Sequence, residues 1–132
     1  DEMGGGQGLP AQVLEELPGR LARQPHAFSV LAFRAGEAVG LMNCFETLST
    51  FKARPLVNIH DLAVSPTARG QGVGGAMLAW VAAMARRRGC CKLTLEVLSG
   101  NARAAALYRR SGFAPYQLDA RHGAAEFWEK VL

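Results

Sequence analysis

The first apolar positions of the chain recur every three or four residues, as they do on one face of a helix. Between residues 10 and 23 this spacing is seen at Val13, Leu14, Leu17 and Leu21. Pro18 and Gly19 interrupt it, because proline lacks an N–H donor and disfavours helical backbone at the residue before it. We therefore expect two short helical pieces in this stretch.

The segments that follow are predicted to be strands. Residues 28–33 and 38–45 are predicted to form a hairpin, because a glycine stands in the turn between them. A polar loop is expected at residues 46–55 and a third strand at residues 56–64. In that strand the alternation predicts one face made of Asn58, His60, Leu62 and Val64, and another made of Ile59, Asp61 and Ala63.

The clearest helix is predicted at residues 75–88. It ends with three arginines, which suit the negative end of the helix dipole, and Gly89 follows at the usual stop position. One apolar stripe runs along it, made of Met77, Leu78, Val81, Met84 and Ala85.

The remaining residues predict a strand at 92–98 and a helix at 102–110 with Asn101 as its cap. Residues 113–118 and 125–132 are expected to close the sheet as an antiparallel pair. The order is then helix, three strands, helix, strand, helix and two strands. It predicts an α/β fold, a mixed sheet with helices on its faces.

The composition suits one domain spanning residues 1–132. Apolar residues make up 49% of the chain, which is enough to bury a sizeable core. Fifteen Lys and Arg residues against eleven Asp and Glu residues give a net charge of +4, which suits an anionic partner. The basic residues form no long run beyond residues 86–88, so we expect no nucleic-acid partner.

Other classes of protein are disfavoured by what the sequence lacks. No apolar run approaches the roughly 20 residues that span a bilayer, and no signal-peptide pattern is present, so we expect a cytoplasmic protein without a membrane partner. The cysteines Cys44, Cys90 and Cys91 are odd in number. Neither they nor the scattered histidines have the spacing of a metal site, so we expect no metal and place the thiols in the core.

A glycine-rich turn joins the predicted strand at 56–64 to the predicted helix at 75–88. A helix start carries N–H groups without internal partners and a partial positive charge, and glycines let an anion approach the backbone. Arg69 adds a full charge, so the turn predicts a pyrophosphate site. The turn reads Val64-Ser65-Pro66-Thr67-Ala68-Arg69-Gly70-Gln71-Gly72-Val73-Gly74-Gly75.

The same glycines allow a second interpretation. Gly70, Gly72 and Gly75 fit the G-x-G-x-x-G pattern of dinucleotide-binding domains, and Glu96 lies downstream where a ribose contact would be. Against it, residues 65–69 separate the strand from the glycines, Glu96 is expected in the middle of a strand, and the chain is too short for a complete dinucleotide domain. A nucleotide-dependent oxidoreductase domain is therefore an alternative.

Two motifs in order carry a family resemblance. Arg69-Gly70-Gln71-Gly72-Val73-Gly74 matches [RQ]-x-x-G-x-[GA], preceded by Asp61-Leu62-Ala63-Val64-Ser65-Pro66 as D-L-x-V-x-P. Residues 101–113 follow N-x-x-A-x-x-L-Y-x-x-x-G-F. Over residues 38–132 the chain resembles the GNAT superfamily of acyl-CoA-dependent N-acetyltransferases. This resemblance implies a GNAT-like fold, with a strongly twisted mixed sheet, splayed middle strands and helices on both faces.

The resemblance also implies acetyl-CoA as cosubstrate and direct transfer of its acetyl group to a primary amine of a small molecule. The pantetheine arm is expected between the strands at 56–64 and 92–98, like an extra strand. The glycine turn is expected to hold the pyrophosphate. The residues implied to bind the cosubstrate are Leu62, Ala63, Val64, Arg69, Gly70, Gln71, Gly72, Val73, Gly74, Gly75, Asn101 and Tyr108.

For catalysis, the resemblance implies that Tyr108 protonates the departing thiolate. A base must also deprotonate the amine, and His60 stands where many relatives have a glutamate. Histidine titrates near neutral pH and could do the same work. Glu96 and Asp61 are alternatives, as is a chain of waters to backbone carbonyls. A cysteine-dependent mechanism is a second choice to direct transfer.

The match to the family is incomplete at its start. Relatives usually have one more strand and helix before the hairpin, so we expect that this part is missing or truncated, or that another subunit completes the sheet. Lys52 and Arg54 mildly favour an acceptor that carries a carboxylate. The C-terminal strands, with Phe127 and Trp128, are a candidate edge for a homodimer. A non-catalytic coenzyme A-binding module is the alternative function.

Overall fold

The computed structural model describes residues 8–117, 119–123 and 125–132. The chain forms two compact units, Asp1–Leu95 and Glu96–Leu132, and each unit is described by itself. The first unit holds a sheet and two helices, and the second holds one helix and the C-terminal segment.

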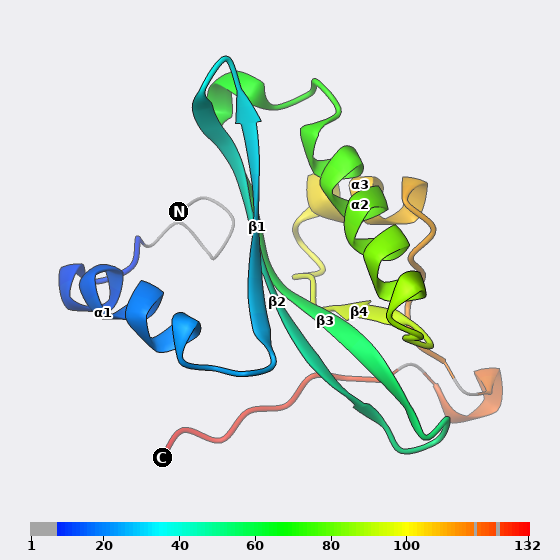
Figure 1. The fold of residues 1–132 in the computed structure, drawn as a ribbon. Coiled ribbons are helices and arrows are strands. Elements are labelled where there is room, and N and C mark those ends of the chain that lie inside the picture. Colours follow the sequence, from blue (N-terminus) through cyan, green and yellow to red (C-terminus); the bar gives the residue numbers. More distant parts are fainter. Residues whose placement is uncertain (1–7, 118, 124) are drawn as a thin grey trace. The chain divides into compact units, whose positions relative to one another are not determined.

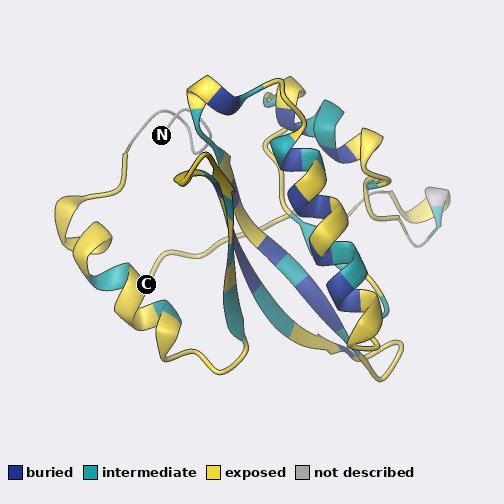
Figure 2. Ribbon diagram, turned by 45° about the horizontal axis from the view of Figure 1, so that its top comes forward, coloured by how far each residue is buried: buried dark blue, intermediate teal, exposed yellow. Residues whose placement is uncertain are grey.

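The sheet of the first unit has four strands in the order β1-β2-β3-β4. Strands β1, β2 and β3 are antiparallel, whereas β4 is parallel to β3, so the sheet is mixed as the sequence predicts (Figure 1). Helices α1 and α2 lie on opposite sides of it (Figures 1 and 2). The strands are β1 (Ala27–Arg34), β2 (Glu37–Ser49), β3 (Arg54–Val64) and β4 (Leu93–Leu95).

The predicted polar loop at residues 46–55 is wrong, because β2 and β3 extend into it as a second hairpin. Their pairing continues to the register Ser49–Arg54, with a turn between them in which Ala53 has φ 48°. Arg54 donates two hydrogen bonds to the carbonyl oxygen of Gly89, at 2.9 and 3.1 Å. The Cys91 N–H donates to the carbonyl oxygen of Pro55 at 2.8 Å. These bonds to residues distant in sequence stabilise the end of the hairpin.

Helix α1 (Ala11–Ala22) is continuous, so the predicted break at Pro18 is wrong. Proline removes one N–H donor, and side-chain pairs four residues apart span the affected turn. Gln12 donates to Glu16 at 3.0 Å, and Arg20 forms an ion pair with Glu16 at 2.8 Å. No residue of α1 is buried.

Helix α2 (Val73–Arg87) supplies most of the helical side of the core, and every residue of its predicted stripe is buried (Figure 2). The sheet opposes it with Met42, Cys44 and Val57, all fully buried. Gly40 of β2 permits a close approach, since a Cβ there would lie 2.7 Å from the Met77 sulfur. The helix ends before Gly89, whose φ is 77°, as the sequence predicts.

The second unit contains helix α3 (Ala102–Arg110), with the bounds and the cap that the sequence predicts. The amide oxygen of Asn101 accepts a hydrogen bond from the Ala104 N–H at 3.0 Å. The predicted closing strands are absent from residues 113–117 and 125–132. A backbone hydrogen bond from the Ala125 N–H to the carbonyl oxygen of Tyr116 joins the two segments. Residue 118 lies outside the described residues. No helix in the described part of the chain is long and apolar enough to cross a membrane.

Candidate active site

A β-bulge in β3 places His60 outside the pairing ladder. Asp61 pairs with Asn43 of β2, and Ile59 pairs with the next residue of β2, Cys44. His60 is therefore an extra residue of β3 between two consecutive pairs. A bulge shifts the side-chain alternation by one residue. The predicted face of Asn58, His60, Leu62 and Val64 is therefore wrong beyond His60. Leu62 instead shares the α2 side of the sheet with Ile59, and both are buried.

On the other side of the sheet, the bulge adjoins a row of polar side chains on three neighbouring strands. The Ser29 hydroxyl donates to Oδ1 of Asn43 at 2.7 Å. Nδ2 of Asn43 donates to Oδ2 of Asp61 at 3.0 Å. The His60 ring meets the Phe45 ring edge-on, with 5.5 Å between their centroids. His60 and Asp61 are exposed, so this face can receive a small polar ligand.

Strand β3 extends beyond the end of its parallel neighbour, β4. Pairing with β4 involves only residues 57–59 of β3, although β3 continues to Val64. Beyond Ile59, the edge toward β4 has no further strand in the described sheet. An extended ligand with amide groups can hydrogen-bond to such an edge. The predicted residues Leu62, Ala63 and Val64 lie on this stretch.

The glycine turn leads from the end of β3 into α2. Gly70 and Gly72 have φ of 72° and 82°, which glycine adopts without steric cost. Arg69 donates from Nε to the carbonyl oxygen of Val64 at 3.1 Å, tying the turn to the strand. Gln71 donates to the carbonyl oxygen of Thr67 at 2.9 Å and accepts from the guanidinium of Arg34.

The first turn of α2 fits an anion. Gly72 is the N-cap, no side chain caps the helix, and no acidic residue lies in its first turn. A Cβ built on Gly70 or Gly72 would meet no heavy atom within 4 Å, so a ligand can reach this backbone. Helix α3 differs, because the side chain of Asn101 accepts a hydrogen bond from one of its first N–H groups, that of Ala104. The predicted residues from Arg69 to Gly75 thus lie on one continuous turn that leads into an uncapped helix start, a feature that favours anions.

The second unit carries the other three predicted residues. Tyr108 of α3 is buried, and its ring lies 6.0 Å from that of Phe113, centroid to centroid. Burial raises the pKa of the Tyr108 phenol. Glu96 is exposed and follows the last residue of β4, so its expected place in mid-strand is wrong. Asn101 caps α3, which is one of the two roles considered for it.

Comparison with known proteins decides the family. Residues 6–113 match the model of the acetyltransferase (GNAT) family. The chain belongs to this GNAT family. The fold agrees: a GNAT family acetyltransferase from Staphylococcus aureus superposes with a TM-score of 0.75 at 16% identity, covering 99% of this chain and 83% of that one.

Two GNAT relatives with named substrates are similar in sequence. Streptothricin acetyltransferase from Streptomyces lavendulae is 39% identical over 76% of this chain and 54% of its own length. The thialysine N-ε-acetyltransferase of Bos taurus is 39% identical over 56% of this chain and 43% of its own length. The chain thus spans about half the length of these relatives.

Two cysteines of this GNAT chain, Cys44 and Cys90, are poor candidates for a nucleophile. Burial, together with the charge of Asp61, raises the pKa of the Cys44 thiol to about 12. Burial also raises the pKa of the Cys90 thiol. A thiol with a raised pKa forms little thiolate, which is the reactive species. Among the described residues, no group of three His, Cys, Asp or Glu side chains could hold a metal ion.

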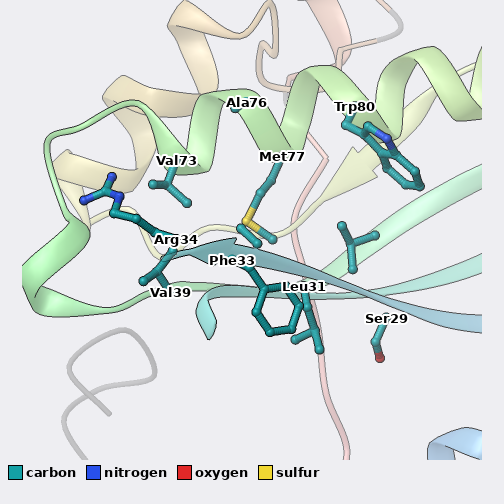
Figure 3. A pocket seen from close by; sticks show the side chains of 11 residues that line it. Ser29, Leu31, Phe33, Arg34, Val39, Val73, Ala76, Met77 and Trp80 are labelled. Atoms are coloured by element: carbon teal, nitrogen blue, oxygen red, sulfur yellow. The ribbon is translucent and has the colours of Figure 1, made fainter. Parts of the chain in front are cut away.

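A cavity of about 640 Å³ lies between β1 and the first half of α2 (Figure 3). Its lining is mainly apolar, with Met77, Val73 and Trp80 from the helix and Phe33 from the strand. It includes Val73 of the glycine turn but none of the candidate catalytic residues. Because transfer to an amine needs acid and base groups, we do not place the reaction in this cavity.

Two polar residues of the site, Ser29 and Asn43, were not singled out from the sequence. Asn43 stands between the apolar residues Met42 and Cys44 in β2 and is only 5% exposed. A buried polar side chain in an apolar strand requires hydrogen-bond partners. That signal was available in the sequence, but the partners could be identified only from the register of three strands.

Proposed function

We propose that this protein is an N-acetyltransferase that moves the acetyl group of acetyl-CoA directly to a primary amine of a small molecule. One observation carries the proposal. The uncapped start of α2 and the end of β3, which pairs with β2 but has no neighbour on its β4 side, belong to a single strand–turn–helix segment. An anion site and a site for an extended amide arm would therefore adjoin. Acetyl-CoA has a pyrophosphate and, in its pantetheine arm, two amide groups. Membership of the GNAT family supports acetyl-CoA as the ligand of these two sites.

The chain's own groups have distinct binding roles in this proposal. The first N–H groups of α2, with Gly70 and Gly72 before them, hold the pyrophosphate. Arg69 keeps the turn in place through Val64 and adds positive charge. The backbone of Leu62 and Val64 pairs with the arm, and Ala63 lies between them. The side chain of Asn101 binds the arm in addition to capping α3.

His60 is proposed as the base for the acceptor. A primary alkylamine has a pKa of about 10.4 and arrives protonated, whereas only its neutral form can attack a thioester. His60 is exposed in the bulge and takes that proton, directly or through water. Asp61 and Glu96 remain the alternative bases. Asp61 also accepts a hydrogen bond from Asn43, which favours a supporting role.

Tyr108 is proposed as the acid. The nitrogen–carbon bond forms as the carbon–sulfur bond breaks, and the leaving sulfur takes the phenolic proton of Tyr108. The proton that the new amide nitrogen loses returns to the Tyr108 phenolate through solvent, which restores the acid. Acetyl-CoA supplies the activated acyl group. The raised pKa of Tyr108 keeps the phenol protonated across the neutral range, so it remains available as a donor.

The acceptor class is proposed from the relatives. Streptothricin and thialysine are named as acceptors in the two relatives, and both are small amines. A small molecule with a free primary amine is therefore our proposed acceptor. The hairpin residues Lys52 and Arg54 favour one that also carries a carboxylate.

The first experiment is a thermal-shift titration with acetyl-CoA, coenzyme A and NAD, followed by thiol release with a panel of amines. A ligand at a hundredfold excess over its dissociation constant stabilises the folded state by about 2.7 kcal/mol. We expect the unfolding temperature to rise with both acetyl-CoA and coenzyme A. We also expect free thiol to be released when acetyl-CoA and an amine are both present. Binding without turnover would favour the non-catalytic module, and a response to NAD alone would favour the oxidoreductase domain.

Two matched variants test the anion site itself. Gly72→Asp and Gly72→Asn carry a similar cost for a positive φ and can both cap α2, but only aspartate repels phosphate. We expect Gly72→Asp to weaken acetyl-CoA binding at least about tenfold more than Gly72→Asn. Equal affinities for acetyl-CoA in the two variants would show that this turn does not bind the pyrophosphate.

A further inference from the structure

The bulged residue His60 receives no support from the strand ladder. The register passes from Asp61–Asn43 to Ile59–Cys44, so no residue of β2 stands opposite His60 in the strand pairing. Its position depends on what holds the residues around it. The residue that follows His60 in the chain is Asp61, and the Asn43 amide donates a hydrogen bond to its carboxylate at 3.0 Å.

The orientation of Asn43 is fixed by its two partners. An ionised carboxylate only accepts hydrogen bonds, so Nδ2 of Asn43 must face Asp61. Oδ1 then faces β1, where the Ser29 hydroxyl donates to it at 2.7 Å. Asn43 is 5% exposed, so water offers little replacement for either bond. A flipped amide would lose both.

Strand β2 also contacts His60 directly. Phe45 lies two residues after Asn43 and therefore on the same face of β2. Its ring packs edge-on against the His60 ring at 5.5 Å. The imidazole is thus held by Phe45 on one side, while Asn43 holds the neighbouring residue Asp61.

We propose that Asn43, oriented by Ser29, is a positioning residue that fixes the β3 bulge and thereby the imidazole of His60 toward the acceptor amine. The inference rests on the proposed role of His60 as the base. It assigns Asp61 a structural task, as the anchor of the bulge.

The experiment uses an exchange of the two polar groups. Asn43→Asp puts two carboxylates in contact and should lower kcat about tenfold, with the KM for acetyl-CoA within about twofold of wild type. The double variant Asn43→Asp with Asp61→Asn restores both hydrogen bonds, because the carboxylate introduced on β2 can accept from Ser29 and from the amide introduced on β3. We expect it to recover at least about half of the wild-type kcat.

Controls separate this role from general stability. Glu46→Gln breaks the 3.4 Å ion pair between Glu46 and Arg88, an interaction of β2 outside the polar row, and should leave kcat within about twofold. Unfolding midpoints are measured for every variant. If Asn43→Asp does not fold, the double variant alone decides, because it keeps the hydrogen bonds and only moves the charge from β3 to β2.

Three outcomes overturn the inference. An Asn43→Asp variant with wild-type kcat shows that the amide positions nothing. A folded double variant with no recovered activity shows that the Asp61 charge itself is required. His60→Gln is measured beside them: unchanged kcat in that variant refutes the proposed base and the inference with it, whereas impaired His60→Gln beside active Asn43→Asp refutes the inference alone.

Discussion

The residues proposed to carry chemistry differ in how the fold treats them. His60 is exposed and stands outside the strand ladder, whereas Tyr108 is buried. Exposure suits a base that must exchange its proton with solvent. Burial suits an acid that must keep its proton until the sulfur leaves, because desolvation disfavours the phenolate.

Replacement of Tyr108 by phenylalanine tests the acid. We expect kcat to fall about a hundredfold, with little change in the KM for acetyl-CoA, because the phenol acts in the transition state. Since burial raises the pKa of Tyr108, the wild-type kcat should be lost only above about pH 10, as the phenol deprotonates.

The measurement is the pH profile of kcat for both proteins. That alkaline loss should be missing from the Tyr108→Phe profile. A variant that keeps wild-type kcat and the same alkaline loss would show that another group protonates the sulfur.

At the scale of elements, the position of α2 against the sheet sets the position of the proposed anion site, because the helix begins directly after Gly72. The closest packing lies at Gly40 of β2. A Cβ there would meet the Met77 sulfur at 2.7 Å, and Ala32 Cβ and Val73 Cγ1 at 3.2 Å each. Val73 is the first residue of α2, so a clash at Gly40 acts on the start of the helix.

We expect Gly40→Ala to destabilise the protein by about 1–3 kcal/mol and to weaken acetyl-CoA binding, because overpacking displaces the helix start. Met77→Ala in the same chain should recover part of both losses by making room. Gly19→Ala is the matched control, since its Cβ would approach only Arg23, at 3.7 Å. Urea unfolding and acetyl-CoA titration give the two readouts, and an unaffected affinity in Gly40→Ala would contradict the argument.

At the scale of the whole molecule, the charge balance favours the proposed cosubstrate. The chain carries a net charge of +4, and acetyl-CoA is a polyanion. Attraction between exposed charges is screened over about 10 Å at 0.1 M salt. The anion site at α2 faces open space, so screening should reach it.

We therefore expect the dissociation constant of acetyl-CoA to rise several-fold between about 0.05 and about 0.5 M salt. Calorimetric titration at several salt concentrations measures this, with a neutral salt that does not compete as phosphate would. A dissociation constant independent of salt would mean that apolar contacts dominate the binding.

The sequence by itself determined the features that depend on neighbours within a few residues. The stripe of α2, the Gly89 stop, the Asn101 cap and the glycine turn follow from helical periodicity, capping and positive φ, which act over one or two turns. The tertiary structure alone decided how far the strands extend and how their side chains meet. The second hairpin, the absence of strands in 113–117 and 125–132, the bulge at His60 and the Ser29–Asn43–Asp61 row depend on how strands pair. That pairing joins residues distant in sequence, and a shift of one residue moves every later side chain to the other face.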